Sequence, residues 1–90
     1  MDEGVPTAPD RGKPDDLVAA LTRAGDALEL LGEPNRWGGR PVIATVEFDG
    51  AEYVARGHDG AERGRGTLTE ALAVLDPDQA ERDDWTRLTR

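Results

Sequence analysis

The sequence contains no cysteine, which excludes disulfide bonds, zinc sites with thiolate ligands and thiol catalysis. It is also poor in aromatic residues, which make up 4% of the chain, and it has one histidine. No stretch approaches the roughly 20 apolar residues that a membrane-spanning helix requires. The first residues include no apolar run of the kind found in secretory signal peptides. These absences together favour a cytoplasmic location.

Positive charge is scarce as well. Eleven lysines and arginines oppose 19 aspartates and glutamates, which gives a formal net charge of −8. Nonspecific nucleic-acid binding depends on neutralising phosphates with basic side chains, so this balance argues against it. The negative field instead favours a basic protein partner. All the basic residues except Lys13 are arginines, and this bias, with abundant alanine, glycine and aspartate, indicates a GC-rich bacterial genome.

Ninety residues with 37% apolar content allow one small domain with a thin core. Such a core rarely contributes more than about 3–5 kcal/mol, which favours dimerisation or binding to a partner. Residues 1–14 contain three prolines and two glycines, a composition typical of a disordered tail. We therefore expect a tail over residues 1–14 and a single α+β domain over residues 15–90.

A long helix is predicted over residues 15–31. Asp15 or Asp16 would cap its start, and Gly32 would end it. Gly25 would lie inside this helix at a cost of about 1 kcal/mol relative to alanine. Apolar residues recur at the three- and four-residue spacing of one helix face, namely Leu17, Ala20, Leu21, Ala24, Leu28 and Leu31.

Three antiparallel strands are predicted to follow as a meander. The segment "VIATVEF" (residues 42–48) alternates between two faces, and Asp49-Gly50 is typical of a two-residue hairpin turn. That turn places Val46 opposite Tyr53. A second Asp-Gly at residues 59–60 predicts a weak third strand over residues 61–65. Its pairings would be Ala55 with Gly64, Tyr53 with Gly66, Val54 with Arg65 and Arg56 with Arg63.

The third strand leads into another helix. Thr67 and Glu70 fit a capping box, in which each side chain accepts a hydrogen bond from the other residue's backbone. Asp76 and Pro77 fit the cap and first position of a further helical turn, and Trp85 is expected to pin a short C-terminal helix. The order of N-terminal helix, three-stranded antiparallel meander, helix and short C-terminal helix predicts a two-layer α+β fold.

The glycines before this helix have two possible roles. Gly64-Arg65-Gly66-Thr67 lies between a strand and a helix, as phosphate-binding loops do. However, the segment has neither a GxGxxG nor a GxxxxGK[ST] motif. We therefore favour the structural interpretation, in which the glycines allow the helix to approach the inner face of the sheet.

The register of the meander predicts that Arg56, Arg63 and Arg65 share its outer face. Guanidinium groups bind anions and carboxylates in a bidentate manner, so this cluster is a candidate anion or acidic-partner site. The alternative is a solvated face on which acidic residues balance the arginines. Trp37, in a glycine-flanked loop, either closes the loop over the core or is an exposed contact residue. The candidate partner- or anion-binding residues are therefore Trp37, Arg56, Arg63 and Arg65.

No catalytic centre can be assembled from the remaining polar residues. His58 is the single histidine and is expected in a turn, without the partners that a catalytic triad or a metal site requires. The pairs Asp15-Asp16 and Asp83-Asp84 are adjacent in sequence, so their carboxylates diverge on a helix surface. We therefore expect no catalytic residue, no metal site and no cofactor.

Residues 53–75, "YVARGHDGAERGRGTLTEALAVL", resemble the central part of HicB-type antitoxins. In that family an aromatic-valine strand leads through a glycine-containing segment into a G-x-T-L-E-E-A-L helix start, which the residues from Gly66 to Leu72 match here. The resemblance implies a regulatory, antitoxin-like role with a protein partner. The chain departs from the family in the long helix predicted before the sheet.

The predicted order of helix, three strands and helix is also similar to that of double-stranded RNA-binding domains. That family carries lysines at the start of its second helix for phosphate contact, whereas Leu68 and Thr69 stand here. The similarity therefore implies a protein-binding relative. We expect a small acidic, non-enzymatic protein-interaction or regulatory module. The alternative is small-ligand or nucleic-acid binding through the arginine-bearing face.

Overall fold

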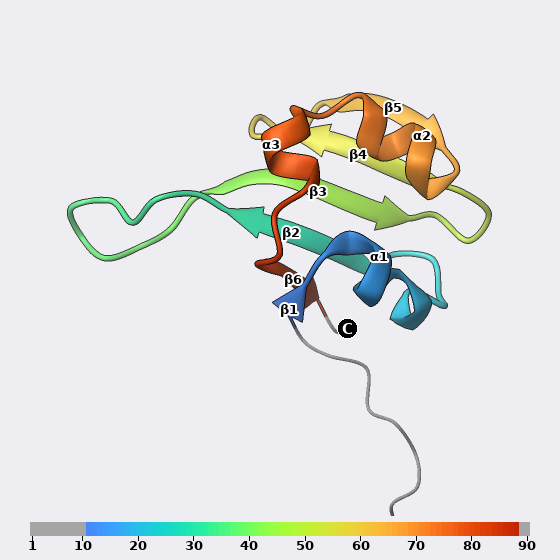
Figure 1. Ribbon diagram of the computed structural model, residues 1–90, viewed down its shortest axis with the longest axis horizontal. Coiled ribbons are helices and arrows are strands. Elements are labelled where there is room, and N and C mark those ends of the chain that lie inside the picture. The colour runs from blue at the N-terminus through green and yellow to red at the C-terminus, as the bar shows by residue number, and fades with distance from the viewer. Residues whose placement is uncertain (1–10, 89–90) are drawn as a thin grey trace, which may run out of the picture.

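The computed structural model describes residues 11–88, which form a small α+β domain around one antiparallel sheet (Figure 1). The strand order is β1-β6-β2-β3-β4-β5. The strands are β1 (Arg11–Gly12), β2 (Ala27–Leu31), β3 (Val42–Phe48), β4 (Tyr53–Gly57), β5 (Glu62–Gly66) and β6 (Trp85–Leu88). The helices are short: α1 (Pro14–Leu17), the 3₁₀ turn η1 (Val18–Ala20), α2 (Leu68–Ala73) and α3 (Pro77–Ala80). None of these helices is long and apolar enough to cross a membrane.

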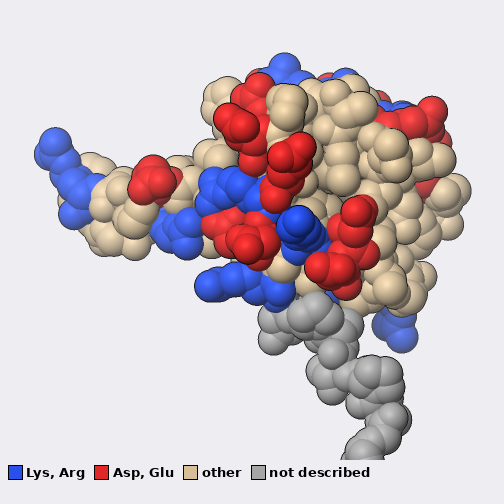
Figure 2. Space-filling view, in the orientation of Figure 1, with Lys and Arg blue, Asp and Glu red and all other residues tan. Residues whose placement is uncertain are grey.

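The helices cover one face of the sheet, which we call the inner face (Figure 1). Alternate residues of β2, β3 and β4 point into the core between the two layers, where they meet α1, η1 and α2. In the space-filling view of this side, basic side chains mark the far end of a projecting loop, and charges of both signs alternate near the centre (Figure 2). The buried cluster consists of Leu17, Leu21, Leu28, Leu30, Ala44, Val46, Ala55, Ala71, Leu75 and Trp85.

The helix predicted over residues 15–31 is wrong beyond Ala20. Gly25 has a φ of +98°, which ends any right-handed helix, and the carboxylate of Asp26 accepts the backbone N–H groups of Thr22 and Arg23 at 3.0 Å. The chain then continues as β2, which pairs with β3 on one side and β6 on the other. Backbone pairing on both sides therefore outweighs the helical spacing of the leucines.

The predicted tail also ends earlier than residue 14. Residues 1–10 lie outside the described residues, so that part of the prediction stays a prediction. Arg11 and Gly12 form β1 opposite Thr86 and Trp85, and α1 begins at Pro14.

The β3–β4 hairpin forms, but its register differs from the prediction by two residues. Asp49–Glu52 make a four-residue loop, because the Asp49 carboxylate accepts the N–H groups of Ala51 and Glu52 at 2.9 and 2.7 Å. Val46 therefore lies opposite Ala55 and not opposite Tyr53. An even shift keeps every side chain on its predicted face.

The β4–β5 pairing follows the prediction up to a bulge. Ala55 faces Gly64, Val54 faces Arg65 and Tyr53 faces Gly66, as the second Asp-Gly turn implied. Arg56, however, faces Glu62, which leaves Arg63 as the extra residue of a β-bulge.

The start of α2 confirms the predicted capping box. Thr67 accepts the N–H of Glu70 at 3.2 Å, and Glu70 accepts the N–H of Thr67 at 2.9 Å. The close approach of sheet and helix is also confirmed, since a Cβ at Gly64 would lie 2.8 Å from a methyl group of Val74.

The prediction of a short C-terminal helix that contains Trp85 is wrong. α3 begins at Pro77 as expected, but Trp85–Leu88 form β6, a strand inserted between β1 and β2. As a strand, this segment buries Trp85 and pairs its backbone with β1 and β2, whereas a helix would have offered the core only a sparse apolar stripe.

Candidate functional site

The candidate site is the outer face of the sheet, opposite the helices. The register places two rows of side chains there, because directly paired residues share a face. No helix within residues 11–88 packs on this face. The first row runs Leu88, Ala27, Glu47, Val54, Arg65, and the second runs Arg11, Thr86, Glu29, Thr45, Arg56, Glu62.

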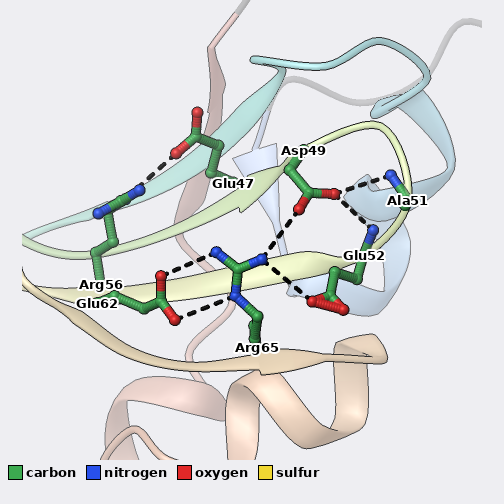
Figure 3. A network of polar contacts seen from close by, with 7 residues as sticks. All are labelled: Glu47, Asp49, Ala51, Glu52, Arg56, Glu62 and Arg65. Atoms are coloured by element: carbon green, nitrogen blue, oxygen red, sulfur yellow. Dashed lines mark hydrogen bonds and ion pairs between the residues drawn. The ribbon is translucent and has the colours of Figure 1, made fainter.

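Arg65 is the centre of a carboxylate network on this face (Figure 3). Its guanidinium donates two hydrogen bonds to Glu62, at 3.1 and 3.0 Å. The remaining nitrogen lies 3.3 Å from Glu52 and 3.4 Å from Asp49. The bulge in β5 brings Glu62 alongside Arg65, and the β3–β4 loop supplies the other two carboxylates.

Arg56 forms a second link across the same face. Its Nε lies 3.3 Å from a carboxylate oxygen of Glu47 on β3, and its Nη1 donates to the carbonyl of Gly60 at 3.1 Å. Val54 stands between these charged groups and is only 2% exposed, although no helix covers it. The aliphatic stems of its neighbours Glu47 and Arg65 therefore shield it from water.

The structure does not bring the four predicted contact residues together. Arg56 and Arg65 share the outer face, but the bulge turns Arg63 away from them. A Cβ at Gly57 would lie 2.6 Å from the Arg63 guanidinium, and Arg63 lines a pocket with Asp76 of the helical side. The predicted cluster of three arginines is therefore wrong for Arg63.

Trp37 lies far from this face, in the loop between β2 and β3, and its side chain is 83% exposed. The structure thus decides between the two interpretations of this residue. It is an exposed side chain and does not close the loop over the core.

Five carboxylates on the outer face and its adjoining loop outnumber the three guanidinium groups of Arg11, Arg56 and Arg65. Arg56 and Arg65 both face carboxylates of this chain, so a phosphate or other anion would have to displace those partners. The sequence pattern does not place Glu29 and Asp49 in this site, because it predicts a helix at the first and a tight turn at the second. The acidic side chains of the face and its adjoining loop are Glu29, Glu47, Asp49, Glu52 and Glu62.

Local hydrogen bonds favour the ionised forms of two of these carboxylates, Glu62 and Asp49. The hydrogen bond from Arg65 lowers the pKa of Glu62 below its ordinary value. Backbone N–H groups of Glu52 and Ala51 lower the pKa of Asp49, and the charge of Arg65 adds to this effect. The carboxylates of Glu62 and Glu52 raise the pKa of Arg65. Asp49 and Glu62 therefore stay ionised at neutral and mildly acidic pH.

Acid should destabilise the domain in part through this network. Because Asp49 and Glu62 have a lower pKa when folded, their stabilisation is fully present above about pH 5 and is lost as the pH falls through the lowered values. We expect the melting temperature to fall below pH 5, and Arg65→Gln to make that fall shallower. Thermal unfolding at stepped pH measures this, with the exposed Arg23→Gln as the control. Equal pH profiles for the two variants would contradict the role of Arg65.

Other chemistry on the described surface is limited. Within residues 11–88, no three His, Asp or Glu side chains are placed to hold a metal ion. His58 is exposed in the β4–β5 turn and contributes to an open pocket of about 310 Å³ that Arg63, Asp76 and Gln79 also line. Asp59 lies 3.4 Å from Arg63 at this pocket, so positive charge there is partly compensated.

Comparison with known proteins gives no family to which the chain can be assigned. No protein-family model, no curated protein and no solved structure matches it.

Proposed function

We propose that this chain is a non-enzymatic protein-interaction module that binds a basic partner on the outer face of its sheet. The observation that carries the proposal is the surplus of carboxylates around Arg56 and Arg65 on a face that no described helix covers. The most specific version of this function is an antitoxin-like or other regulatory role, in which the outer face neutralises a basic protein.

The electrostatics of the face favour a cationic ligand over an anionic one. Glu29, on the same face, has no arginine directly opposite it, because Thr45 and Thr86 are its cross-strand neighbours. The net charge of −8 would steer a basic protein towards the domain from a distance. A rigid sheet then presents its carboxylates at fixed spacing, which favours arginine-rich partners that form bidentate pairs.

The residue inventory supports a binding role over a catalytic one. The chain contains neither serine nor cysteine, and His58 stands in an exposed turn. Threonine and tyrosine remain as hydroxyl nucleophiles, but none of them is hydrogen-bonded to a base within residues 11–88.

A competing proposal is that a small anionic ligand binds in the pocket beside Arg63 and His58. The lining side chains of Arg63, His58 and Gln79 could donate hydrogen bonds to such a ligand. A thermal-shift screen with nucleotides and phosphosugars would detect it. Arg63→Ala should remove any stabilisation that results, and Arg65→Ala should not.

Binding to an oligoarginine peptide tests the site of the main proposal. The triple substitution Glu29→Gln, Glu47→Gln and Glu62→Gln should weaken binding by about tenfold or more and reduce its salt dependence. The control replaces Asp16, Asp78 and Asp83, which are exposed and lie outside the outer face, by asparagine. It removes the same charge and should have less effect. Equal losses in the two variants would show that net charge alone binds the peptide and would contradict the proposed site.

Co-expression with the proteins encoded beside this gene tests the biological form of the proposal. A true partner should co-purify with the wild-type chain and with the asparagine control, and it should be lost with the glutamine variant. Double-stranded RNA and an oligoglutamate peptide serve as negative ligands. Binding of either one with the affinity of oligoarginine would contradict the preference for a basic partner.

A further inference from the structure

We propose that two copies of this chain associate by inserting the tip of the β2–β3 loop of one copy into a groove between the helices of the other. We call residues 32–41 the arm, and the surface lined by α1, α2 and α3 the helical groove. Neither surface belongs to the outer face, so this inference stands independently of the proposed function.

The arm is an ordered hairpin that projects from the sheet (Figure 1). Backbone hydrogen bonds continue the pairing beyond the strands, from Gly32 to Pro41 at 2.7 Å and from Asn35 to Gly39 at 2.7 Å. At the base, Arg40 donates from its Nε to the carbonyl of Gly32 at 2.8 Å. The arm therefore needs little further ordering to bind, which removes one of the main costs of association.

The tip of the arm presents an aromatic ring at a fixed position. The carboxamide oxygen of Asn35 accepts the backbone N–H groups of Trp37 at 2.9 Å and Gly39 at 3.0 Å, which closes the tip. Gly38 supplies the positive φ that this turn requires. Trp37 is 83% exposed, and the guanidinium of Arg36 lies 5.5 Å from the centre of its ring. The tip therefore combines a large apolar surface with a positive charge.

The helical groove has the complementary chemistry. α2, α3 and the turn between them line an open cavity of about 400 Å³, with Asp15 of α1 and Glu81 at its edge. A second cavity adjoins the first. It is lined by Lys13 and Pro14 together with the same two acidic residues. The surface of the groove is mostly apolar, and it is formed by Leu72, Ala73, Leu75, Pro77 and Ala80.

Charge decides which surface of a second copy the arm can approach. Two chains that each carry −8 repel one another over most of their surfaces. The tip is an exception, because Arg36 accompanies Trp37 there. If the indole of Trp37 packs on the apolar surface of the helical groove, Arg36 comes close to Asp15 or Glu81 at its edge. The partner that this tip fits best within the described structure is therefore another copy of the same chain.

The geometry favours a closed dimer over an intramolecular contact. The arm extends β2 and β3 away from the helices, so the tip does not meet its own groove (Figure 1). If each copy inserts its arm into the groove of the other, both arms and both grooves are occupied. The assembly then closes as a two-fold symmetric dimer. Two tryptophans bury far less than the roughly 800 Å² per partner of a stable interface. We therefore expect a weak dimer, with a dissociation constant between about 10 µM and 1 mM.

Sedimentation of the full chain at increasing concentration tests this inference. Trp37→Ala should raise the dissociation constant by about tenfold or more, as expected for an aromatic anchor. Ala73→Arg, which fills the groove from an exposed helical position, should do the same. The matched control is Ala61→Arg, an exposed alanine in the β4–β5 turn, which adds the same charge and should leave association unchanged.

A mixing experiment separates this arrangement from any other dimer. Trp37→Ala keeps an intact groove and Ala73→Arg keeps an intact arm, so the mixed dimer retains one of the two contacts. An equal mixture should therefore associate more strongly than either variant alone and more weakly than the wild type. A monomeric wild-type chain at millimolar concentration, or a mixture that associates no more than the separate variants, would overturn the inference. The glutamine variant of the outer face should dimerise as the wild type does, which keeps this result separate from the fate of the proposed function.

Discussion

Replacing Trp85 by alanine should lower the free energy of unfolding by about 3–5 kcal/mol, which is most of the stability expected for a domain of this size. Trp85 is completely buried and is the largest side chain in the core. Its indole N–H donates to the carbonyl of Gln79 at 3.0 Å, which ties the end of α3 to β6. The substitution would leave a cavity and remove this hydrogen bond, and β6 joins β1 to the rest of the sheet.

Urea denaturation followed by circular dichroism measures this loss. Trp37→Ala is the matched control, because it removes the same side chain from an 83% exposed position and should change stability by less than about 0.5 kcal/mol. Trp85→Phe should fall between the two, since it keeps much of the packing and loses only the hydrogen bond and part of the volume. Equal effects of the two alanine variants would contradict the position of Trp85 in the core.

The centre of the sheet was the most predictable part of the fold, because its determinants are local. The alternation in residues 42–48 and the two Asp-Gly turns identify β3, β4 and β5. Thr67 and Glu70 lie three residues apart, so the capping box can be read directly from the sequence. The two-residue error in the first hairpin arose because Asp49 accepts two backbone N–H groups and so stabilises a longer loop.

The two outer parts of the sheet could not be predicted from local pattern. The spacing of Leu17, Leu21 and Leu28 fits one face of a helix, and all three are indeed buried. They reach the core from α1, from the end of η1 and from β2, however. β2 is stabilised by β3 and β6, and β6 lies more than 50 residues away in sequence. Such distant pairing leaves no periodic signal in either segment.

The same reason explains how much of the outer face was predicted. Arg56, Arg65 and their neighbours Glu47 and Glu52 lie on the predicted meander, and the predicted alternation of the strands placed them together, whereas Glu62 reaches the face only through the bulge. A β-bulge locally reverses the alternation of side chains between the two faces of the sheet. Arg63 was therefore assigned to the wrong face. Glu29 joined the face only through the pairing of β2 with β3.

Replacing Gly66 by alanine should cost about 2–4 kcal/mol, a large effect for the addition of one methyl group. Gly66 has a φ of +139°, a conformation that alanine adopts only with strain of about 1–3 kcal/mol. A Cβ at this position would also collide with the carboxylate of Glu70. That carboxylate accepts the N–H of Thr67, so moving it would break half of the capping box, worth about 1 kcal/mol.

A double-mutant cycle separates the strain from the collision. Gly60→Ala is the control for strain alone, because Gly60 has a φ of +79° with open space around the position of a Cβ. It should cost about 1 kcal/mol. In a Glu70→Ala background the colliding carboxylate is absent, so the cost of Gly66→Ala should fall towards that of Gly60→Ala.

This cycle also tests the interpretation of the glycine segment. If Gly66 serves to admit the Glu70 side chain, the two substitutions must be coupled by about 1 kcal/mol or more in urea denaturation. If the glycine were instead kept open for a phosphate, Gly66→Ala would cost only its backbone strain, and Glu70→Ala would not alter that cost. Because the carboxylate of Glu70 occupies the space that the missing side chain leaves, we expect the coupled result.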